Sequence, residues 1–448
     1  MTKDFSAWLI FLFLLAVLLT FSTLGRNSLW FDEAWSVFRA RQPVETALAG
    51  NIDLGRPPLY YIALHYWIDR FGSGEISVRL PSVLAYLFST GLVYLLGLQL
   101  SNRGTALAAM SLLALSPLYV WYAQEVRMYI FIAALGLIAA NGLVWGRWLA
   151  VLPVTAALTA GLYVDFPMIP LWIGLSAAFL VYWQAKDQPA RPFFVWLVST
   201  IFSILLYQPW WSRAAALLKL LNNIHVFRAT RQVLRLPEFS AGQYAAMILA
   251  AGAGLVFLFW LAYKLFRQDR IRRILTPPIL ILFLALTVAF VWPRFFGVKR
   301  VLATGWPYVC LFIAWLVAAW EEKRRIIWYG LMGVSLAATL VMLLAVPKDD
   351  WRGAVAYVTD HARVGDVVWI DPAWNNVAWS YYQPEIPAYS GSQEQLEQLA
   401  VTDVWLVAER FPGQAAPSSP DEVWLDENLQ LVESIPFYRL EVRHYRPN

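Results

Sequence analysis

The chain has 448 residues, of which 59% are hydrophobic and 15% are charged. Soluble domains typically carry about 25% charged residues, so this composition excludes an ordinary soluble protein and indicates a polytopic membrane protein. The net charge is +5, but the basic clusters lie beside apolar segments, which argues against a nucleic-acid partner. The single cysteine, Cys310, lies in an apolar run and can form no disulfide within the chain. An outer domain without disulfides favours a bacterial envelope over the eukaryotic secretory lumen.

Apolar runs of about 17–22 residues recur along the chain, and each is long enough to cross a bilayer as a helix. They predict about eleven transmembrane helices, near residues 6–24, 80–100, 104–121, 128–145, 148–164, 167–183, 193–211, 241–263, 274–292, 300–319 and 326–346. The first run is too long for a typical signal-peptide core, and no clear cleavage site follows it. We therefore expect a retained first span.

The loop at 264–273 orients the predicted array. It is short and carries five basic residues, Lys264, Arg267, Arg270, Arg272 and Arg273. Short basic loops mark the cytoplasmic side, so counting along the spans places the N-terminus inside and the C-terminal tail outside. The outer side also carries basic residues: Arg56, Arg79, Arg127, Arg213, Lys219, Arg228, Arg231, Arg235, Arg294, Lys299 and Arg300. Capture of an anionic ligand explains this excess, while snorkelling to lipid phosphates is the alternative for some of them.

The first outer loop, residues 25–79, carries two adjacent carboxylates, Asp32 and Glu33, directly after the first span. Carboxylates just outside a bilayer can deprotonate a hydroxyl or hold a cation near a phosphate. The alternative is that they are solvated first-turn acids of an amphipathic helix over 32–49, where the helix dipole favours them. A second, aromatic helix is expected from Leu59, after Arg56-Pro57-Pro58 breaks the first.

Four outer elements bring acids and cations to one face under this topology. They are Asp32-Glu33, the run from Arg56 to Tyr61, the run from Gln124 to Tyr129, and Lys299-Arg300. The cations could hold a phosphate while a carboxylate activates the group that displaces it. For Glu125 and Arg127 the alternative is a local helix-start acid beside a snorkelling arginine.

The composition becomes polar after Pro347, and apolar residues recur there at the short intervals typical of helices and strands in a small domain. Helices are expected over 350–358, 375–383 and 392–400, and strands over 365–370 and 404–408. The predicted organisation is therefore a transmembrane domain over 1–346 and a small extracytoplasmic α/β domain over 347–448. About a hundred residues are enough to bury a core of their own.

These motifs, in this order, resemble the GT-C membrane glycosyltransferases, in the branch of the protein O-mannosyltransferases and aminoarabinose transferases. The likeness covers about residues 5–345 and rests on an ordered set: Asp32-Glu33, Pro57-Pro58-Leu59-Tyr60-Tyr61, Ala123-Gln124-Glu125-Val126-Arg127-Met128-Tyr129, and Arg300-Val301-Leu302. The segment from Asp349 to Ala354 also resembles the start of the outer domain in many bacterial members. The resemblance implies a GT-C-like fold.

The resemblance also implies an activity, which is inverting transfer of a sugar from a polyprenyl-phosphate donor to an acceptor hydroxyl outside the cytoplasm. The acceptor could be a glycolipid, a polysaccharide or a protein, and the enzyme would lie in the bacterial inner membrane. The resemblance implies no required cofactor. A divalent cation near the acids is possible, and its ligands are unknown.

The resemblance implies that the positions of this chain that match the family's motifs are site residues. Asp32 is implied as general base, with Glu33 as companion acid and Glu125 as second-loop acid. The donor phosphate would contact Arg56, Arg127, Lys299 and Arg300, and the substrates would contact Trp35, Tyr60, Tyr61, His65, Tyr129 and Asp165. Many relatives have His or Lys where this chain has Arg56, some have His where it has Asp165, and relatives commonly have Tyr where it has Val301.

Two other classes of function fit a polytopic protein with outer charges. A flippase for lipid-linked saccharides would place ionisable residues near the middle of its spans and show internal repeats, whereas these spans are mostly free of charge. A catalytically inactive scaffold that binds a partner would have no need of the acidic pair, which is present here. The pattern favours the enzyme.

The orientation can be tested by cysteine labelling after Cys310 has been replaced. A cysteine at Gln268 is expected to resist a membrane-impermeant maleimide in intact cells, because the basic loop is predicted to be cytoplasmic. A cysteine at Ser392 is expected to react. Labelling at Gln268 with protection at Ser392 would reverse the predicted topology.

Overall fold

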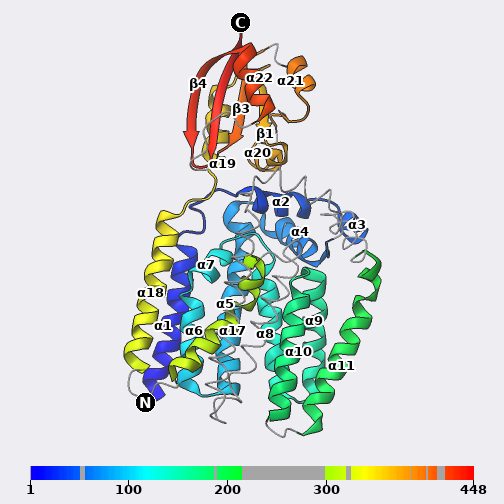
Figure 1. Ribbon diagram of the computed structural model, residues 1–448, viewed down its shortest axis with the longest axis vertical. Coiled ribbons are helices and arrows are strands. Elements are labelled where there is room, and N and C mark those ends of the chain that lie inside the picture. Colours follow the sequence, from blue (N-terminus) through cyan, green and yellow to red (C-terminus); the bar gives the residue numbers. More distant parts are fainter. Residues whose placement is uncertain are drawn as a thin grey trace, which may run out of the picture.

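The computed structural model describes residues 2–50, 56–185, 189–213, 298–318, 324–383, 385–399, 402–410 and 419–448. In this part of the chain, a bundle of long helices is covered at one end by a layer of short helices, and a small α/β domain lies beyond that layer (Figure 1). The N-terminus lies at the opposite end of the bundle from the α/β domain. This confirms the coarse prediction of a mainly helical protein with a small C-terminal sheet.

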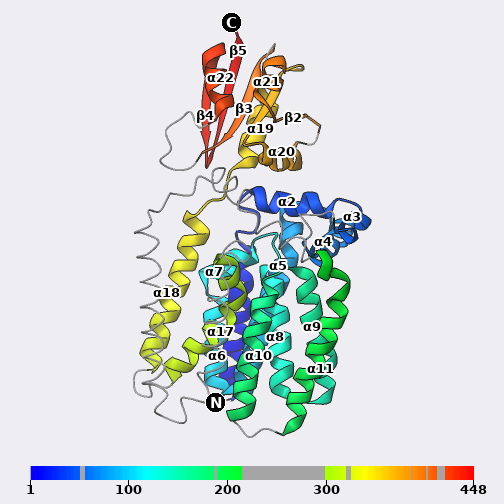
Figure 2. The same ribbon diagram turned by 45° about the vertical axis from the view of Figure 1, so that its right-hand side comes forward.

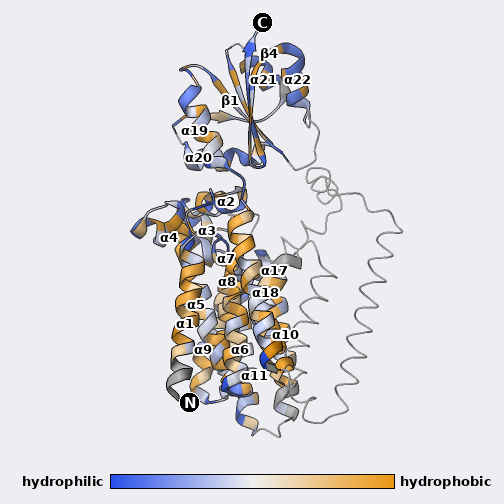
Figure 3. Cartoon of the chain, turned by 90° about the vertical axis from the view of Figure 1, so that its left-hand side faces the viewer, coloured by the Kyte–Doolittle hydropathy of each residue, from blue (hydrophilic) through white to orange (hydrophobic). Residues whose placement is uncertain are grey.

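The bundle helices are apolar around most of their circumference, as expected where one side packs on neighbours and the other faces lipid (Figure 3). They are α1 (Thr2–Phe21), α5 (Glu75–Leu100), α6 (Arg103–Ala114), α7 (Pro117–Ala123), α8 (Tyr129–Trp145), α9 (Val151–Val164), α10 (Met168–Ala185), α11 (Ala190–Tyr207), α17 (Val298–Ala318) and α18 (Arg324–Ala345). The 3-10 turns η2 (Trp148–Ala150) and η3 (Gln208–Trp210) precede α9 and follow α11.

Nine of the eleven predicted spans coincide with helices, and the other two, 241–263 and 274–292, lie outside the described residues together with the basic loop at 264–273. Within the described chain, three helices are long and apolar enough to cross a membrane by length and composition. They are Glu75–Leu100, Ala190–Arg213 and Arg325–Ala345; α6 and α7, bent by 59° at their junction, make a fourth if they form one span. The count of about eleven stays a prediction.

Local sequence explains how α5, α6 and α7 meet. Gly97 lets α5 approach α6 closely, because a Cβ at that position would lie 2.7 Å from the Cα atom of Ala106. The break between α6 and α7 lies at Ser116-Pro117, where the Ser116 side chain accepts a hydrogen bond from the backbone N–H of Tyr119 and Pro117 occupies the first turn. This break turns the end of α7 toward residues 124–128, which carry two of the predicted site residues.

The covering layer consists of α2 (Phe31–Ala40), α3 (Val44–Leu48) and α4 (Leu59–Phe71), which lie across the end of the bundle (Figure 2). The prediction of one amphipathic helix over 32–49 is wrong: the structure has two helices with Pro43 between them, because proline disfavours helical backbone at the residue before it. The aromatic helix predicted from Leu59 is α4.

The C-terminal domain, which we call the outer domain after its predicted location, contains a five-stranded sheet in the order β2-β1-β3-β5-β4. β1 is parallel to β2 and β3, and β5 is antiparallel to β3 and β4. The strands are β1 (Val367–Asp371), β2 (Ala388–Tyr389), β3 (Val404–Glu409), β4 (Leu429–Phe437) and β5 (Leu440–Pro447). In this register Trp369 pairs with Leu406, and Leu406 pairs with Arg443. The predicted strands over 365–370 and 404–408 are β1 and β3, whereas β2, β4 and β5 were not predicted.

Helices cover both faces of this sheet. They are α19 (Trp351–His361), α20 (Asn376–Tyr382), α21 (Gln393–Leu399) and α22 (Pro420–Asn428), with the 3-10 turn η4 (Ala373–Asn375) before α20. The first two pack over Trp405 and Val442, and the last two pack over the opposite face at Leu406 and Tyr445. Residues 346–350 connect α18 to α19 at the place where the sequence predicted the domain boundary.

Candidate active site

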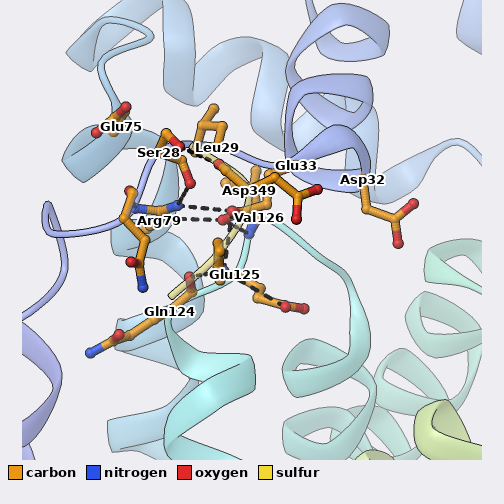
Figure 4. A network of polar contacts seen from close by, with 12 residues as sticks. Ser28, Leu29, Asp32, Glu33, Glu75, Arg79, Gln124, Glu125, Val126 and Asp349 are labelled. Carbon is orange, nitrogen blue, oxygen red and sulfur yellow. Dashed lines mark hydrogen bonds and ion pairs between the residues drawn. The ribbon is translucent and has the colours of Figure 1, made fainter. Parts of the chain in front are cut away.

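Three segments far apart in the sequence meet where the bundle joins the covering layer: the first turn of α2, residues 124–128 between α7 and α8, and the connection at 346–350 (Figure 4). Each carries charged side chains that are buried or partly buried. The site is therefore assembled by tertiary contacts.

Glu33 is the most enclosed acid of the site, with 0% of its side chain exposed. The Arg79 guanidinium donates two parallel hydrogen bonds to it, from Nε to Oε1 at 2.9 Å and from Nη2 to Oε2 at 2.8 Å. Lys348 Nζ donates to Oε2 at 3.1 Å, and the backbone N–H of Val126 donates to Oε1 at 3.1 Å. Burial raises the pKa of Glu33, but the charges of Arg79 and Lys348 outweigh it and hold the pKa at about 2. Glu33 is therefore an ionised anchor at neutral pH.

Arg79 extends this anchor to the chain that leads out of α1. Its remaining N–H groups donate to the backbone carbonyls of Leu24 and Asn27, both at 2.8 Å, and of Ser28 at 3.0 Å. One guanidinium thus ties the start of α5 to the loop before α2 and to Glu33. Sequence analysis counted Arg79 among the outer cations but gave it no role; its position one residue before an apolar span was the available signal.

Glu125 is the second buried acid, and its carboxylate Oε1 lies 3.7 Å from Lys348 Nζ. Burial raises its pKa to about 7; the nearby negative charges of Glu33 and Asp32 also raise it, while Lys348 and Arg127 lower it. Glu125 therefore exchanges its proton near neutral pH, unlike Glu33. The sequence predicted the acid but missed Lys348, which carries no motif and stands out only because it follows the last apolar span directly.

Asp32 lies apart from the Glu33 network, although the two residues are adjacent in α2 (Figure 4). Its side chain is 27% exposed, and its Oδ2 lies 3.7 Å from Arg127 Nη2. Arg127 is buried and also donates to the Asp32 carbonyl at 3.2 Å and to the Ser36 hydroxyl at 3.3 Å. The first turn of a helix turns successive side chains in different directions, so the pair divides into one accessible acid and one buried acid.

Three of the predicted substrate-contacting tyrosines gather around Arg127. The Arg127 Nη2 donates to the Tyr129 hydroxyl at 3.3 Å, and its Cζ lies 5.7 Å from the centre of the Tyr129 ring. Tyr60 and Tyr61, from the start of α4, are buried and close enough to interact electrostatically with the guanidinium. These rings hold the arginine beside Asp32.

A second pair of opposite charges joins Arg56 to Asp165, with Nη1 of the arginine 3.6 Å from Oδ2 of the aspartate. Asp165 is the C-cap residue that follows α9, and its Oδ1 accepts a hydrogen bond from the backbone N–H of Phe166 at 2.9 Å. The sequence predicted both residues as site residues but not that they pair with each other.

The structure does not bring all the predicted residues together. The described contacts of Trp35 are with Arg39, whose Cζ lies 4.1 Å from its ring centre, and with Phe31 and Phe38. His65 contacts the Ala40 carbonyl at 2.7 Å and Asp69, on its own helix, at 3.4 Å. Lys299 and Arg300 belong to the first turn of α17, and their side chains lie outside the described part of the chain.

Within the described residues, no group of three or more His, Cys, Asp or Glu side chains is arranged to hold a metal ion. Glu33 pairs with Arg79 and Lys348 instead, and Lys348 also lies beside Glu125. The divalent cation suggested near Asp32, Glu33 and Glu125 stays a prediction.

Solved structures of other proteins have a similar fold, which supports the fold predicted from the sequence motifs. ArnT from Cupriavidus metallidurans is similar to this chain, with a TM-score of 0.59 in the apo state at 12% identity, covering 98% of each chain. The structure of ArnT bound to undecaprenyl phosphate has a TM-score of 0.57 at 11% identity, and the match also covers 98% of each chain.

An archaeal structure is similar over most of the chain. It is the Archaeoglobus fulgidus oligosaccharyltransferase tethered with an acceptor peptide that contains the NVT sequon, with a TM-score of 0.52 at 13% identity over 90% of this chain and 69% of that one. The sequence matches no protein-family model, and no curated protein matches it significantly. At these identities the likeness establishes the fold.

Replacing Arg79 with methionine is expected to lower the free energy of unfolding by about 3–5 kcal/mol, because Glu33 would lose its bidentate partner inside the protein. Arg352→Gln is the matched control, since it breaks the Arg352–Glu75 ion pair, whose arginine is 47% exposed. Exposed pairs contribute about 0–1 kcal/mol. Unfolding in mixed detergent micelles measures both variants, and equal losses would contradict the anchoring role of Arg79.

Glu125 should make stability fall as the pH rises. Because its pKa in the folded protein is about 7, against an ordinary value of 4.5, the unfolded chain loses this proton first between those pH values. Its contribution is therefore complete below about pH 4.5 and is lost as the pH rises through 7. We expect a decrease on the order of 1–3 kcal/mol between pH 5 and 8 that is absent in Glu125→Gln. Glu33 acts in the opposite direction and only at strongly acid pH. Identical pH profiles for the two proteins would refute the assignment.

Proposed function

We propose that this protein is a glycosyltransferase that moves a sugar from a polyprenyl-phosphate-linked donor to a hydroxyl group of an acceptor outside the cytoplasm, with inversion at the anomeric carbon. The observation that carries the proposal is the pairing of the partly exposed Asp32 carboxylate with the buried Arg127 guanidinium at 3.7 Å. The fold shared with ArnT, which has been crystallised with undecaprenyl phosphate, supports a lipid phosphate as the donor carrier.

The proposed reaction forms one bond and breaks another at the anomeric carbon. The acceptor oxygen attacks this carbon while its proton passes to Asp32, and the bond from the same carbon to the phosphate oxygen breaks. The polyprenyl phosphate leaves with the electron pair and gains negative charge. Attack from the face opposite the leaving phosphate inverts the configuration.

Arg127 and Arg56 are the described cations that would hold the phosphate. A guanidinium is always charged and binds phosphate in a bidentate manner, so it can stabilise the charge that the leaving group gains. Each is paired with an aspartate, Arg127 with Asp32 and Arg56 with Asp165. An arriving phosphate would share the arginine with the aspartate and loosen this ion pair, which would free Asp32 to accept a proton. Lys299 and Arg300 stay predicted phosphate contacts.

We propose different roles for the three acids. Asp32 is the general base, because it is the one of the three whose side chain is partly exposed. Glu33 already accepts hydrogen bonds from four N–H groups, which suits an anchor for the first turn of α2 more than a companion acid. Glu125 lies beside this anchor, and its proton equilibrium near pH 7 would tune the charge next to Asp32.

The placement in the cell is part of the same proposal. The chain would lie in the bacterial inner membrane with its N-terminus inside, a transmembrane domain over 1–346 and an outer domain over 347–448. The buried charges of the described bundle gather at the end nearest the outer domain, whereas transporters place such residues near the midplane. This arrangement favours the enzyme over the flippase.

The activity can be tested with purified protein in detergent and a radiolabelled undecaprenyl-phosphate sugar, with transfer or hydrolysis as the expected result. The same lipid in proteoliposomes tests the alternative. Movement of the lipid across the membrane without cleavage of the sugar–phosphate bond would replace the glycosyltransferase by a flippase.

Asp32→Asn is expected to lower turnover by about 10²–10⁴-fold, because asparagine keeps the shape but cannot take the acceptor proton. Binding of undecaprenyl phosphate, measured separately, should change little, since the arginines hold the phosphate. Glu45→Gln is the matched control: Glu45 is also a first-turn acid of a covering helix, α3, and it is exposed. Near-normal turnover in Asp32→Asn would remove the general base from the proposal.

A further inference from the structure

The connection between α18 and α19 carries a lysine that turns inward. α18 ends at Ala345 and α19 begins at Trp351, and between them the Lys348 side chain is only 5% exposed. Lysine is almost never fully buried unless it is paired, because removing its charge from water costs several kcal/mol. A buried lysine in a short connection therefore calls for a specific explanation.

The ammonium group of Lys348 bridges two segments of the site. It lies 3.1 Å from Glu33 Oε2 in α2, 3.2 Å from the Gln124 carbonyl oxygen and 3.7 Å from Glu125 Oε1. The Trp121 ring of α7 lies 5.1 Å from Nζ, within the range of a cation–π contact. One point charge thus holds the start of α2 against residues 124–125.

The backbone around Lys348 is fixed on the side of the bundle. The Arg26 guanidinium donates to the carbonyl oxygens of Leu343 and Leu344 at the end of α18. The Ser28 hydroxyl donates to the Asp349 carbonyl at 2.5 Å. The connection therefore cannot move without disturbing the loop that leads into α2.

The outer domain holds the same connection from its other side. The backbone N–H of Asp350 donates to the Tyr438 carbonyl at 3.1 Å, and Arg439 lies 3.4 Å from the Asp349 carboxylate. Tyr438 and Arg439 form the turn between β4 and β5. Lys348 is thus placed by the outer domain and by the bundle together.

We propose that Lys348 is a positioning residue of the active site, which sets the distance between the first turn of α2 and residues 124–127 and so places Asp32 against Arg127. The inference rests on the proposed function. Lys348 pairs with Glu33 and Glu125, and each of these acids is at most two residues from a reacting group: Glu33 follows Asp32, and Val126, whose N–H donates to Glu33, precedes Arg127. The contacts of Lys348 within the described residues are with Glu33, Gln124, Glu125 and Trp121 and do not include Asp32 or Arg127, so its action is indirect.

The test compares Lys348→Met, which removes the charge, with Lys348→Arg, which keeps it. The first readout is thermal stability between pH 5 and 9, which follows the proton of Glu125 without requiring activity. The groups facing Glu125 are Lys348, Glu33, Asp32 and Arg127, and only the first changes. The loss of stability should still begin near pH 4.5, which the unfolded chain sets. In Lys348→Met we expect it to become larger and to level off about 1–3 pH units higher, because an adjacent opposite charge shifts a pKa by that amount. Lys348→Arg and the control Arg352→Gln should keep the profile of the unaltered protein.

The second readout is transfer from a radiolabelled undecaprenyl-phosphate sugar. Lys348→Met is expected to lose about 10²-fold in turnover with little change in undecaprenyl phosphate binding, because a misplacement of about 1 Å has that effect on a reaction. Lys348→Arg should recover most of the loss. An unshifted stability profile in Lys348→Met, or full turnover in that variant, would overturn the proposal.

A double variant keeps the test decisive if Lys348→Met fails to fold. Lys348→Met/Glu125→Gln removes both charges of the pair and leaves Glu33 with Arg79, so it should be more stable than the single variant. Equal stability of the two would show that Lys348 does not compensate Glu125, and the proposal would fail. If the unaltered protein transfers no sugar, the proposed function fails while the stability readout still decides the role of Lys348.

Discussion

The buried ion pair between Glu33 and Arg79 is the interaction on which the outer end of this protein depends. An uncompensated charge inside a protein is strongly destabilising, so neither partner can be withdrawn without the other. Arg79 uses its remaining N–H groups on three backbone carbonyls between α1 and α2, and Glu33 accepts a further hydrogen bond from residue 126. The end of α1, the start of α2, the start of α5 and the segment before α8 are therefore held at one point.

This arrangement explains how two adjacent acids can differ in role. Glu33 faces the bundle and is saturated with hydrogen bonds, whereas Asp32 faces Arg127 and retains contact with solvent. Glu33 fixes the first turn of α2, and the position of this turn sets the direction of the Asp32 side chain. The proposed reaction requires a carboxylate within reach of a phosphate and would benefit from such support, because small displacements are costly for a reaction.

The covering layer and the outer domain add a second restraint. Leu29 donates its backbone N–H to the Tyr382 hydroxyl at 2.6 Å, and that hydroxyl donates to Glu75 at 2.5 Å. Tyr381 donates to the Ser73 carbonyl at 2.7 Å. The outer domain thus rests on the loops that flank α2 and α4, and its docking and the geometry of the site are physically linked.

The sequence by itself determined the class of fold, most apolar helices and the polar C-terminal segment, and it predicted the acids and arginines of the candidate site. These follow from hydropathy and from short motifs, which act within one segment. It placed one helix over 32–49 where Pro43 divides two. It missed β2, which has two residues, β4, which is largely exposed, and β5, whose buried positions include the polar Arg443 and His444. Only the tertiary structure decided that Asp32 pairs with Arg127, that Arg56 pairs with Asp165, and that Lys348 enters the site from a position 315 residues after Glu33. The physical reason is that the charge partner of a side chain depends on which helix ends are brought together by packing. The local sequence does not specify the distance between those ends.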